Sequence, residues 1–308
     1  MPERDDKTLE ISGINITHPD QTMFPDAGLR KGDLARHYHR IGDRMRDIIA
    51  HRPLSLVRCP DGLKGDCFYQ RHVNRGFPDQ LREIDIAEKS GGTGKYLYLT
   101  SVAGLIGAVQ MGTVEFHPWG ARTDDIEKPD RVIFDLDPDK ELDFAKTKKA
   151  AFEMRDRLSD LGLSSTAMVT GGKGIHVIVH LRRTVSWDDV KGFAKTLATT
   201  MADDSPDRFT ATMSKEKRSG KIFIDWLRNE RSATSIAPYA VRSRAGAPVA
   251  LPVRWAELDD IDAANVFHVG DMENRLKRAC PYLGGQADLQ TLSKSILEEM
   301  QKQKPADN

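Results

Sequence analysis

Two aspartates stand two positions apart at the end of an apolar stretch, in residues 131–139 (RVIFDLDPD). Valine, isoleucine and phenylalanine favour a strand, and alternate residues of a strand point to one face, so Asp135 and Asp137 project together. Neighbouring carboxylates repel each other unless a cation lies between them, and such hard oxygen ligands suit Mg²⁺ or Mn²⁺. The pair predicts half of a two-metal site for phosphoryl transfer. A solvated acidic turn is the alternative.

A third carboxylate, Asp225, lies inside the apolar segment 221–228 (KIFIDWLR). A buried carboxylate is costly unless it is paired or binds a metal. We therefore predict that Asp225 completes the metal site with Asp135 and Asp137. A salt bridge to a nearby arginine is the alternative.

A glycine-rich turn, residues 170–176 (TGGKGIH), separates two short apolar segments with strand character. Glycines at this density allow backbone amides to approach an anion closely. Lys173 supplies a positive charge, and Thr170 and His176 supply hydrogen bonds. The turn predicts a triphosphate-binding site that is not a P-loop, or else a plain hairpin.

Aromatic and basic residues that could contact DNA occur elsewhere in the chain. Phe68 and Tyr69 adjoin Arg71, and rings beside cations are suited to base stacking and phosphate contact, although they are also ordinary strand content. Lys31 precedes a predicted helix start, where an anion is favoured. Arg218 lies in the basic loop 203–220, which suits a phosphate backbone or is simply solvated.

These residues need an α/β framework to position them. Apolar residues recur at helical spacing after Asp33, which is a plausible N-cap, and Ser186 is a second plausible N-cap. Strand-like and helix-like segments alternate through the rest of the chain. The predicted helices cover about residues 33–49, 101–110, 144–161, 186–201 and 289–300.

Composition excludes several classes of protein. Lysine plus arginine equals aspartate plus glutamate at 46 each, so any basic binding surface must be local. Cys59, Cys67 and Cys280 form no C-x-x-C pair, which argues against a disulfide scaffold or zinc ribbon and fits a reducing cytoplasm. The charged N-terminus predicts no signal peptide, and no apolar run is long enough to cross a membrane. We expect a cytoplasmic protein associated with the bacterial nucleoid.

Four motifs in this order together resemble one family: residues 134–138 (FDLDP), 170–176 (TGGKGIH), 224–226 (IDW), and 237–239 (APY) with Arg242. They are similar to the polymerase domain of bacterial DNA ligase D, a member of the archaeo-eukaryotic primase superfamily. Residues 29–34, 68–72 and 110–119 also resemble this domain, so the resemblance covers roughly residues 10 to 300.

The resemblance implies a template-dependent nucleotidyltransferase that extends a primer 3′-OH at DNA ends or gaps in non-homologous end joining. It implies a preference for ribonucleotides over deoxynucleotides and two divalent ions, Mn²⁺ or Mg²⁺, held by Asp135, Asp137 and Asp225. Nucleotide-binding residues would be Thr170, Lys173, His176, Arg242, His117 and Arg52. DNA-binding residues would be Lys31, at a downstream 5′-phosphate, together with Phe68, Tyr69, Arg71 and Arg218.

Two positions depart from the family pattern. Gln21 stands where relatives commonly have a second lysine, so recognition of the 5′-phosphate is expected to be weaker. Arg228 stands where some relatives have a neutral amide, so local substrate contacts are expected to differ.

The resemblance also implies a fold and partners. We expect an α/β (α+β) fold in a single compact domain, residues 1–300, with an N-terminal lobe (about 10–120), a catalytic lobe (about 121–300) carrying an RRM-like mixed sheet, and a disordered tail (301–308). No K-x-D-G motif occurs, so ligation would need a separate ATP-dependent ligase, with Ku as a further partner. Two alternatives remain: a primase that starts strands de novo, and a non-catalytic DNA-end-binding module for Ku or a ligase.

Overall fold

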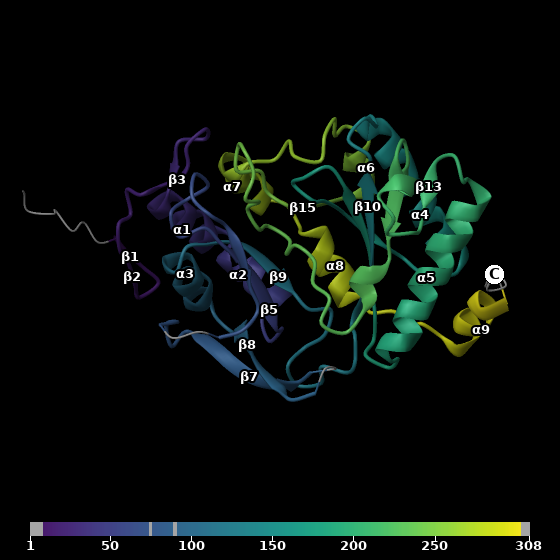
Figure 1. Cartoon of the computed structure of the whole chain (residues 1–308), viewed down its shortest axis with the longest axis horizontal. Helices are drawn as coiled ribbons and strands as arrows, with labels where there is room; N and C mark the ends of the chain where they lie inside the picture. The colour runs from purple at the N-terminus through teal and green to yellow at the C-terminus, as the bar shows by residue number, and fades with distance from the viewer. Residues whose placement is uncertain (1–8, 74–75, 89–90, 303–308) are drawn as a thin grey trace, which may run out of the picture. The chain divides into compact units, whose positions relative to one another are not determined.

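Contacts within the chain group its residues into two units. Figure 1 shows the computed structural model with its helices and strands labelled. The structure describes residues 9–73, 76–88 and 91–302. The first unit comprises Met1–Pro118, Ile236–Val249 and Phe267–Arg278, and the second comprises Trp119–Ser235, Ala250–Val266 and Ala279–Asn308. The predicted lobes differ from these units, because the segments from 236 and 267 pack into the first unit: Ala237 N donates to Phe116 O at 2.8 Å, for example.

The second unit is built on a six-stranded sheet in the order β13-β14-β10-β12-β11-β15. All its neighbouring strands are antiparallel except β13 and β14, which are parallel. This mixed sheet agrees with the predicted α/β class. The strands are β10 (Arg131–Pro138), β11 (Thr166–Val169), β12 (Ile175–His180), β13 (Phe209–Thr210), β14 (Ile222–Asp225) and β15 (Leu251–Val253).

Two long helices, α4 (Phe144–Asp160) and α5 (Trp187–Asp204), pack against β10. Phe134 of β10 meets Phe193 of α5 with ring centroids 6.4 Å apart. Because alternate strand residues face opposite ways, the neighbouring Asp135 points away from α5. Ser186 begins α5 in a capping box with Asp189, so the predicted N-cap is confirmed. Apolar packing on one face of the sheet thus leaves the acids on the other.

Shorter helices and helical turns complete the second unit. The C-terminal helix α9 (Lys294–Lys302) begins later than predicted and includes residues 301 and 302, which were assigned to the tail. Residues 303–308 lie outside the described residues. The remaining turns are η1 (Glu216–Arg218), η2 (Leu227–Asn229), α6 (Trp255–Leu258) and α8 (Pro281–Ala287).

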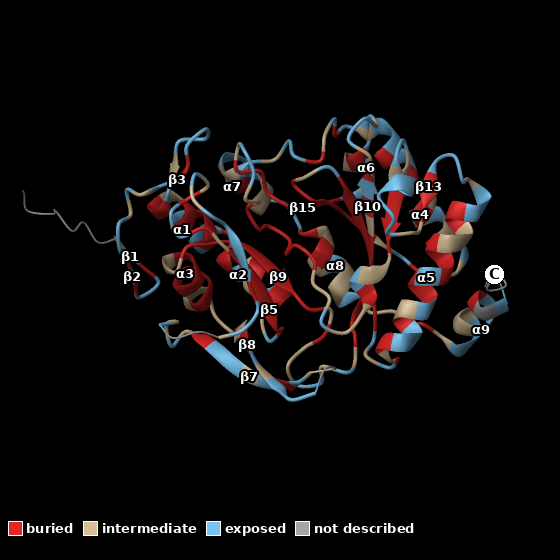
Figure 2. Cartoon of the chain, viewed as in Figure 1, coloured by how far each residue is buried: buried red, intermediate tan, exposed pale blue. Residues whose placement is uncertain are grey.

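The first unit contains a sheet in the order β6-β5-β8-β7, with β9 also paired to β5. Every residue of β9 is buried, whereas β7 is largely exposed (Figure 2). The strands of this sheet are β5 (Leu54–Arg58), β6 (Phe68–Gln70), β7 (Leu81–Ala87), β8 (Thr93–Leu99) and β9 (Thr113–Pro118). Two hairpins precede it: β1 (Leu9–Ile11) with β2 (Ile14–Ile16), and β3 (Thr22–Phe24) with β4 (Leu29–Arg30).

The helices of the first unit show one capping residue that was wrongly predicted. Helix α1 (Lys31–Arg40) begins two residues before Asp33, with Arg30 as N-cap. Asp33 instead occupies the third helical position and accepts a hydrogen bond from Arg30 N at 3.0 Å. The helix ends at Ile41, and a second helix, α2 (Gly42–Ile49), follows directly. The other helices are α3 (Val102–Gln110), η3 (Val269–Asp271) and α7 (Met272–Leu276).

The cysteines are a second difference from the sequence prediction. Cys59 and Cys67 form a disulfide with a Cα–Cα distance of 4.3 Å, whereas Cys280 is free and buried. The pairing follows from the sheet register, because Arg58 of β5 lies opposite Phe68 of β6. The next residues outward, Cys59 and Cys67, therefore face each other, although their sequence separation of 8 is longer than that of a C-x-x-C motif. The absence of C-x-x-C spacing, which argued against a disulfide scaffold, therefore did not exclude a disulfide between these two cysteines.

The described helices include none that combines the length and apolarity needed to span a bilayer.

Candidate active site

Strand pairing brings three aspartates of the second unit to one face of the sheet. Asp135 of β10 lies directly opposite Asp225 of β14 in the antiparallel register. Directly opposite residues share a face of a sheet, and Asp137 shares it with Asp135 because it lies two residues further along β10. The structure therefore places together the three acids that the sequence singled out from two distant segments.

Two of these carboxyls have raised pKa values, and each shift has a physical cause. Partial burial and then the charge of Asp135 raise the pKa of Asp137, although its side chain is exposed at the strand end. Burial raises the pKa of Asp225 as well, against the opposing charge of Arg228. Crowding of negative charge on a half-buried face is the arrangement that a bound cation relieves.

Cations surround the acidic face. Arg228 of η2 places Nε 3.0 Å from Asp225 Oδ2 and 3.6 Å from Asp135 Oδ2. The charges of Arg218 and Lys173 partly oppose the rise in the pKa of Asp137. Arg218 also stacks on the Phe223 ring, with its guanidinium carbon 3.7 Å from the ring centroid. The sequence predicted Arg218 as a DNA contact, and the structure places its charge near the acids.

The donor set fits a hard divalent cation in chemistry, since it consists of three carboxylates on one face, two of which have raised pKa values. Among the residues that the structure describes, no three His, Cys, Asp or Glu side chains are gathered closely enough to hold an ion as they stand. Arg228 forms ion pairs with two of the three aspartates. Binding of a metal by Asp135, Asp137 and Asp225 would require these side chains to reorient.

The glycine-rich turn between β11 and β12 lies beside the acids. Asp135 is paired with His176 of β12, whose Nε2 is 3.5 Å from Asp135 Oδ1. Thr170 closes the turn, its hydroxyl donating to Gly174 O at 3.0 Å, and Lys173 is exposed at its tip. A Cβ on Gly174 would lie 2.5 Å from Leu136 O and 3.3 Å from Asp135 Oδ1, so only glycine allows this close approach.

The first unit holds a second polar cluster, centred on a residue that the sequence prediction missed. Glu115 of β9 is only 2% exposed. Its Oε2 lies 2.8 Å from His117 Nε2 and 3.2 Å from Arg242 Nε, and its Oε1 accepts from both Ser243 N and Ser243 Oγ at 2.6 Å. The Tyr69 ring packs edge-on to His117 at 5.7 Å. The missed signal was an acid within the apolar strand 113–117, the same signal that identified Asp225.

The other predicted contacts of the first unit differ in their exposure. Phe68 and Tyr69 are 44% and 64% exposed, as stacking on a base requires, and Arg71 is exposed. Lys31 is 6% exposed, and burial lowers its pKa to about 8. Arg52 is 1% exposed and its Nε donates to Ile48 O at 3.0 Å, so burial does not favour its predicted contact with a nucleotide.

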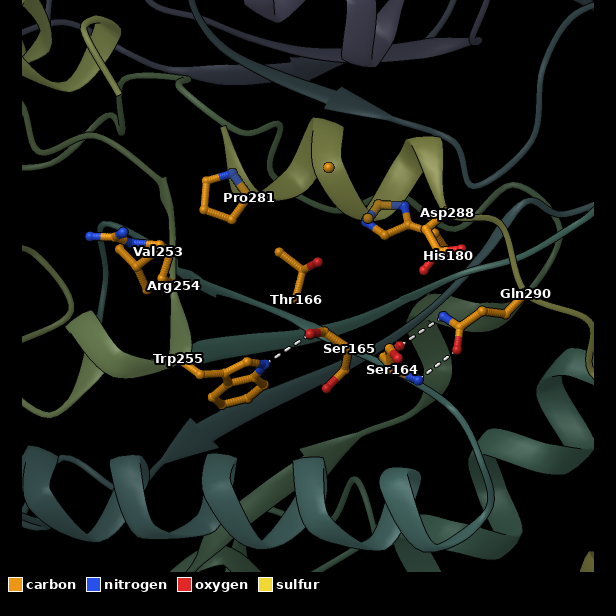
Figure 3. A pocket seen from close by; sticks show the side chains of 12 residues that line it. Ser164, Ser165, Thr166, His180, Val253, Arg254, Trp255, Pro281, Asp288 and Gln290 are labelled. Carbon is orange, nitrogen blue, oxygen red and sulfur yellow. Dashed lines mark hydrogen bonds between the residues drawn. The ribbon is translucent and has the colours of Figure 1, made fainter. Parts of the chain in front are cut away.

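A cavity of about 340 Å³ lies elsewhere in the second unit (Figure 3). Hydrogen bonds from Trp255 Nε1 to Ser165 O and between Gln290 and the Ser164 backbone border it. No predicted site residue lines it. Its lining comes from β11, β12, β15, α6, α8 and the segment after α8: Ser164, Ser165, Thr166, His180, Val253, Arg254, Trp255, Pro281, Gly284, Gly285, Asp288 and Gln290.

Comparison with known proteins gives a consistent result. A family model described as LigD, primase-polymerase domain, matches residues 30–282. The chain is 39% identical over 265 residues to the multifunctional non-homologous end joining protein LigD of Pseudomonas aeruginosa, covering 86% of this chain and 31% of that protein. It is 33% identical over 255 residues to the corresponding LigD of Mycobacterium tuberculosis, covering 80% of this chain and 34% of that protein.

A solved structure has the same fold. The polymerase domain from Mycobacterium tuberculosis ligase D, in complex with DNA, superposes with a TM-score of 0.82 at 30% identity, covering 90% of this chain and 99% of that chain. The fold and the comparisons define a polymerase domain of the bacterial end-joining DNA repair proteins. The chain belongs to the LigD primase-polymerase domain family, which confirms the resemblance found in its motifs. It spans about a third of the length of the curated LigD relatives named above.

Proposed function

We propose that this chain is a template-dependent nucleotidyltransferase that adds nucleotides, preferentially ribonucleotides, to a primer 3′-OH at DNA ends or gaps. The observation that carries the proposal is the register that sets Asp135 opposite Asp225, with Asp137 on the same face. Asp135, Asp137 and Asp225 would hold two divalent ions, Mg²⁺ or Mn²⁺, which when bound lower the pKa of the attacking hydroxyl and neutralise charge on the leaving pyrophosphate.

Residues of the same unit supply the contacts for a triphosphate. The glycine turn lets backbone amides approach an anion, Lys173 adds a positive charge at its tip, and the buried His176 adjoins Asp135. Arg218 and Arg228 add positive charge beside the acids. These three cations balance the charge of the three carboxylates, so a polyanionic substrate would not meet a site of net negative charge.

Residues of the first unit are assigned to the nucleotide sugar, the base and the DNA. His117 would contact the sugar, Arg242 the phosphates, and Phe68 and Tyr69 would stack on bases. Lys31 would bind the 5′-phosphate of a downstream strand, with Arg71 as a further contact to DNA. Ku and an ATP-dependent ligase would be partners in end joining, by analogy with the activity named for the relatives.

Primer extension tests the proposal. On a gapped duplex with a 5′-phosphate, the wild-type chain is expected to add NTPs more efficiently than dNTPs in Mn²⁺ or Mg²⁺. Asp137→Asn should abolish extension, since it removes a metal ligand while keeping the side-chain volume. Glu141→Gln neutralises an exposed carboxylate that follows β10 and should extend normally. Normal extension by the Asp137 variant would overturn the proposal.

De novo priming is the second candidate, because the matching family model is described as a primase-polymerase domain. An unprimed template incubated with NTPs separates the two activities. Labelled dinucleotides made without a primer would favour a primase, whereas extension restricted to primed substrates would favour the end-joining polymerase.

A further inference from the structure

The buried carboxylate of Glu115 holds together the nucleotide-binding residues of the first unit. Its two oxygens make four polar contacts, at 2.6–3.2 Å, with His117, Arg242 and Ser243. His117 lies on the same strand, whereas Arg242 and Ser243 come from a segment more than a hundred residues away. One side chain therefore joins β9 to the loop that carries Arg242.

The charge state of Glu115 follows from these contacts. Burial by itself raises the pKa of Glu115, but the hydrogen bond from His117 and the charge of Arg242 outweigh burial and hold the pKa well below its ordinary value. The carboxylate is therefore ionised at neutral pH and acts only as an acceptor. A buried charge of this kind is stabilised only while its hydrogen-bond donors stay in place. The carboxylate in turn holds those donors in position.

An ionised Glu115 also determines the tautomer of His117. The 2.8 Å contact joins Glu115 Oε2 to His117 Nε2, and because a carboxylate cannot donate, the hydrogen must lie on Nε2. A neutral His117 ring then carries its acceptor lone pair on Nδ1. The same oxygen forms an ion pair with Arg242, 3.2 Å from its Nε, and the Arg242 side chain remains 16% exposed.

We propose that Glu115 is a positioning residue, which orients His117 and Arg242 for the incoming nucleotide by fixing the imidazole tautomer and the guanidinium direction. The inference rests on the proposed function, in which these two residues contact the sugar and the phosphates. In this role Glu115 would contact neither the substrate nor a metal itself. Its role resembles that of a carboxylate behind a metal-bound histidine, which orients the ring without binding the ligand.

The test is Glu115→Gln, which keeps the volume but replaces one acceptor by an amide donor that faces other donors. We expect the KM for NTP to rise about 10–100-fold, as when the partner of a ligating histidine is removed, with a smaller change in kcat. Glu115→Asp restores the charge at shorter reach and should recover part of the loss. Glu83→Gln, which neutralises an exposed carboxylate on β7 of the same unit, is the matched control and should change neither parameter.

A spectroscopic measurement tests the inference independently of catalysis. In the wild-type chain, nitrogen-15 NMR of the histidine rings should show His117 with its hydrogen on Nε2, and Glu115→Gln should shift the ring toward the other tautomer. An unchanged KM or an unchanged tautomer in a folded Glu115→Gln variant would overturn the inference. If that variant does not fold, Ser243→Ala, which removes one hydroxyl contact to Oε1, should still raise the KM several-fold, and a wild-type KM would count equally against the inference.

The two proposals fail in different ways. If the wild-type chain extends no primer, the proposed function is wrong. The affinity for ATP, measured by calorimetry, and the His117 tautomer still decide whether Glu115 positions its two neighbours. If the wild-type chain polymerises but Glu115→Gln matches it in KM and in tautomer, only the positioning role is wrong.

Discussion

Individual side chains show how the candidate site balances its charge. Asp135, Asp137 and Asp225 crowd negative charge on one face, and Arg228 partly neutralises it through contacts with two of them. A divalent ion bound as proposed would compete with Arg228 for the same carboxylate oxygens. Substitution of Arg228 is therefore expected to alter the metal affinity.

We expect Arg228→Gln to tighten metal binding, because it removes the competing cation and leaves the carboxylates unchanged. The guanidinium is 42% exposed, so the pair is partly screened by water and the expected gain in Mn²⁺ affinity is about twofold to fivefold. Electron paramagnetic resonance of free Mn²⁺ measures it. Arg157→Gln breaks the ion pairs of Arg157 with Glu153 of α4 and Asp204 of α5 and should leave the affinity unchanged. Equal or weaker Mn²⁺ binding by Arg228→Gln would contradict this account.

Lys31 provides a prediction about pH. Burial lowers its pKa to about 8, so the free protein loses the ammonium charge as the pH rises through about 8. The preference for a 5′-phosphorylated end over a 5′-hydroxyl end should be greatest below pH 8 and should decline above it. Fluorescence anisotropy with the two DNA ends measures this preference. Lys31→Arg keeps its charge over this range, so its preference should stay flat; an equal decline in that variant would assign the effect to another group.

At the scale of elements, the turn between β11 and β12 depends on the absence of a side chain at position 174. A Cβ there would press on Leu136 O and Asp135 Oδ1. The close approach puts the turn against the strand that carries the acids. This contact between backbone segments cannot be recognised from the glycine pattern alone.

Gly174→Ala is expected to lower the free energy of unfolding by about 1–3 kcal/mol, the usual cost of overpacking, and to reduce primer extension. Gly192→Ala is the matched control, because Gly192 lies within α5 and a Cβ there meets nothing within 4 Å. That variant should gain up to about 1 kcal/mol, since alanine favours a helix more than glycine does. Chemical denaturation compares the two, and equal stability of both variants would exclude the close approach.

At the scale of the whole molecule, the site carries a cost in stability. Asp137 has a folded pKa above its unfolded value, so its stabilising contribution is complete below the unfolded pKa of 3.8 and is lost as the pH rises through the raised folded pKa. At neutral pH the ionised group therefore destabilises the fold. Residues selected for binding a cation are expected to behave in this way when the cation is absent.

Asp137→Asn should accordingly raise Tm at pH 7 in a chelating buffer, by about 1–3 °C, while abolishing extension. Added Mn²⁺ should raise the Tm of the wild-type chain, because a ligand that binds only the folded state stabilises it. The variant should respond less, since it lacks one ligand. Scanning calorimetry with and without Mn²⁺ measures all four values. A lower Tm for the variant in chelator would mean that Asp137 stabilises the fold through contacts other than those described.

Much of the framework follows from local patterns. Strand periodicity predicts that Asp135 and Asp137 share a face, and the N-cap at Ser186 follows from local side-chain chemistry. The order of motifs predicted the family, which the comparisons confirmed. Local patterns did not predict the first residues of α1 and α9, or the short helices near residues 255–287. These boundaries depend on packing rather than on hydrophobic periodicity.

The sequence by itself determined which residues have side chains suited to the proposed chemistry: the three acids, the glycine turn and the exposed aromatics. Only the tertiary structure decided which of them meet. The register that sets Asp135 against Asp225, the strand ends that bring Cys59 to Cys67, and the loop that delivers Arg242 to Glu115 all join distant segments. Such pairings depend on how strands align and on which buried charges find partners, and these are properties of the packed chain rather than of any local stretch.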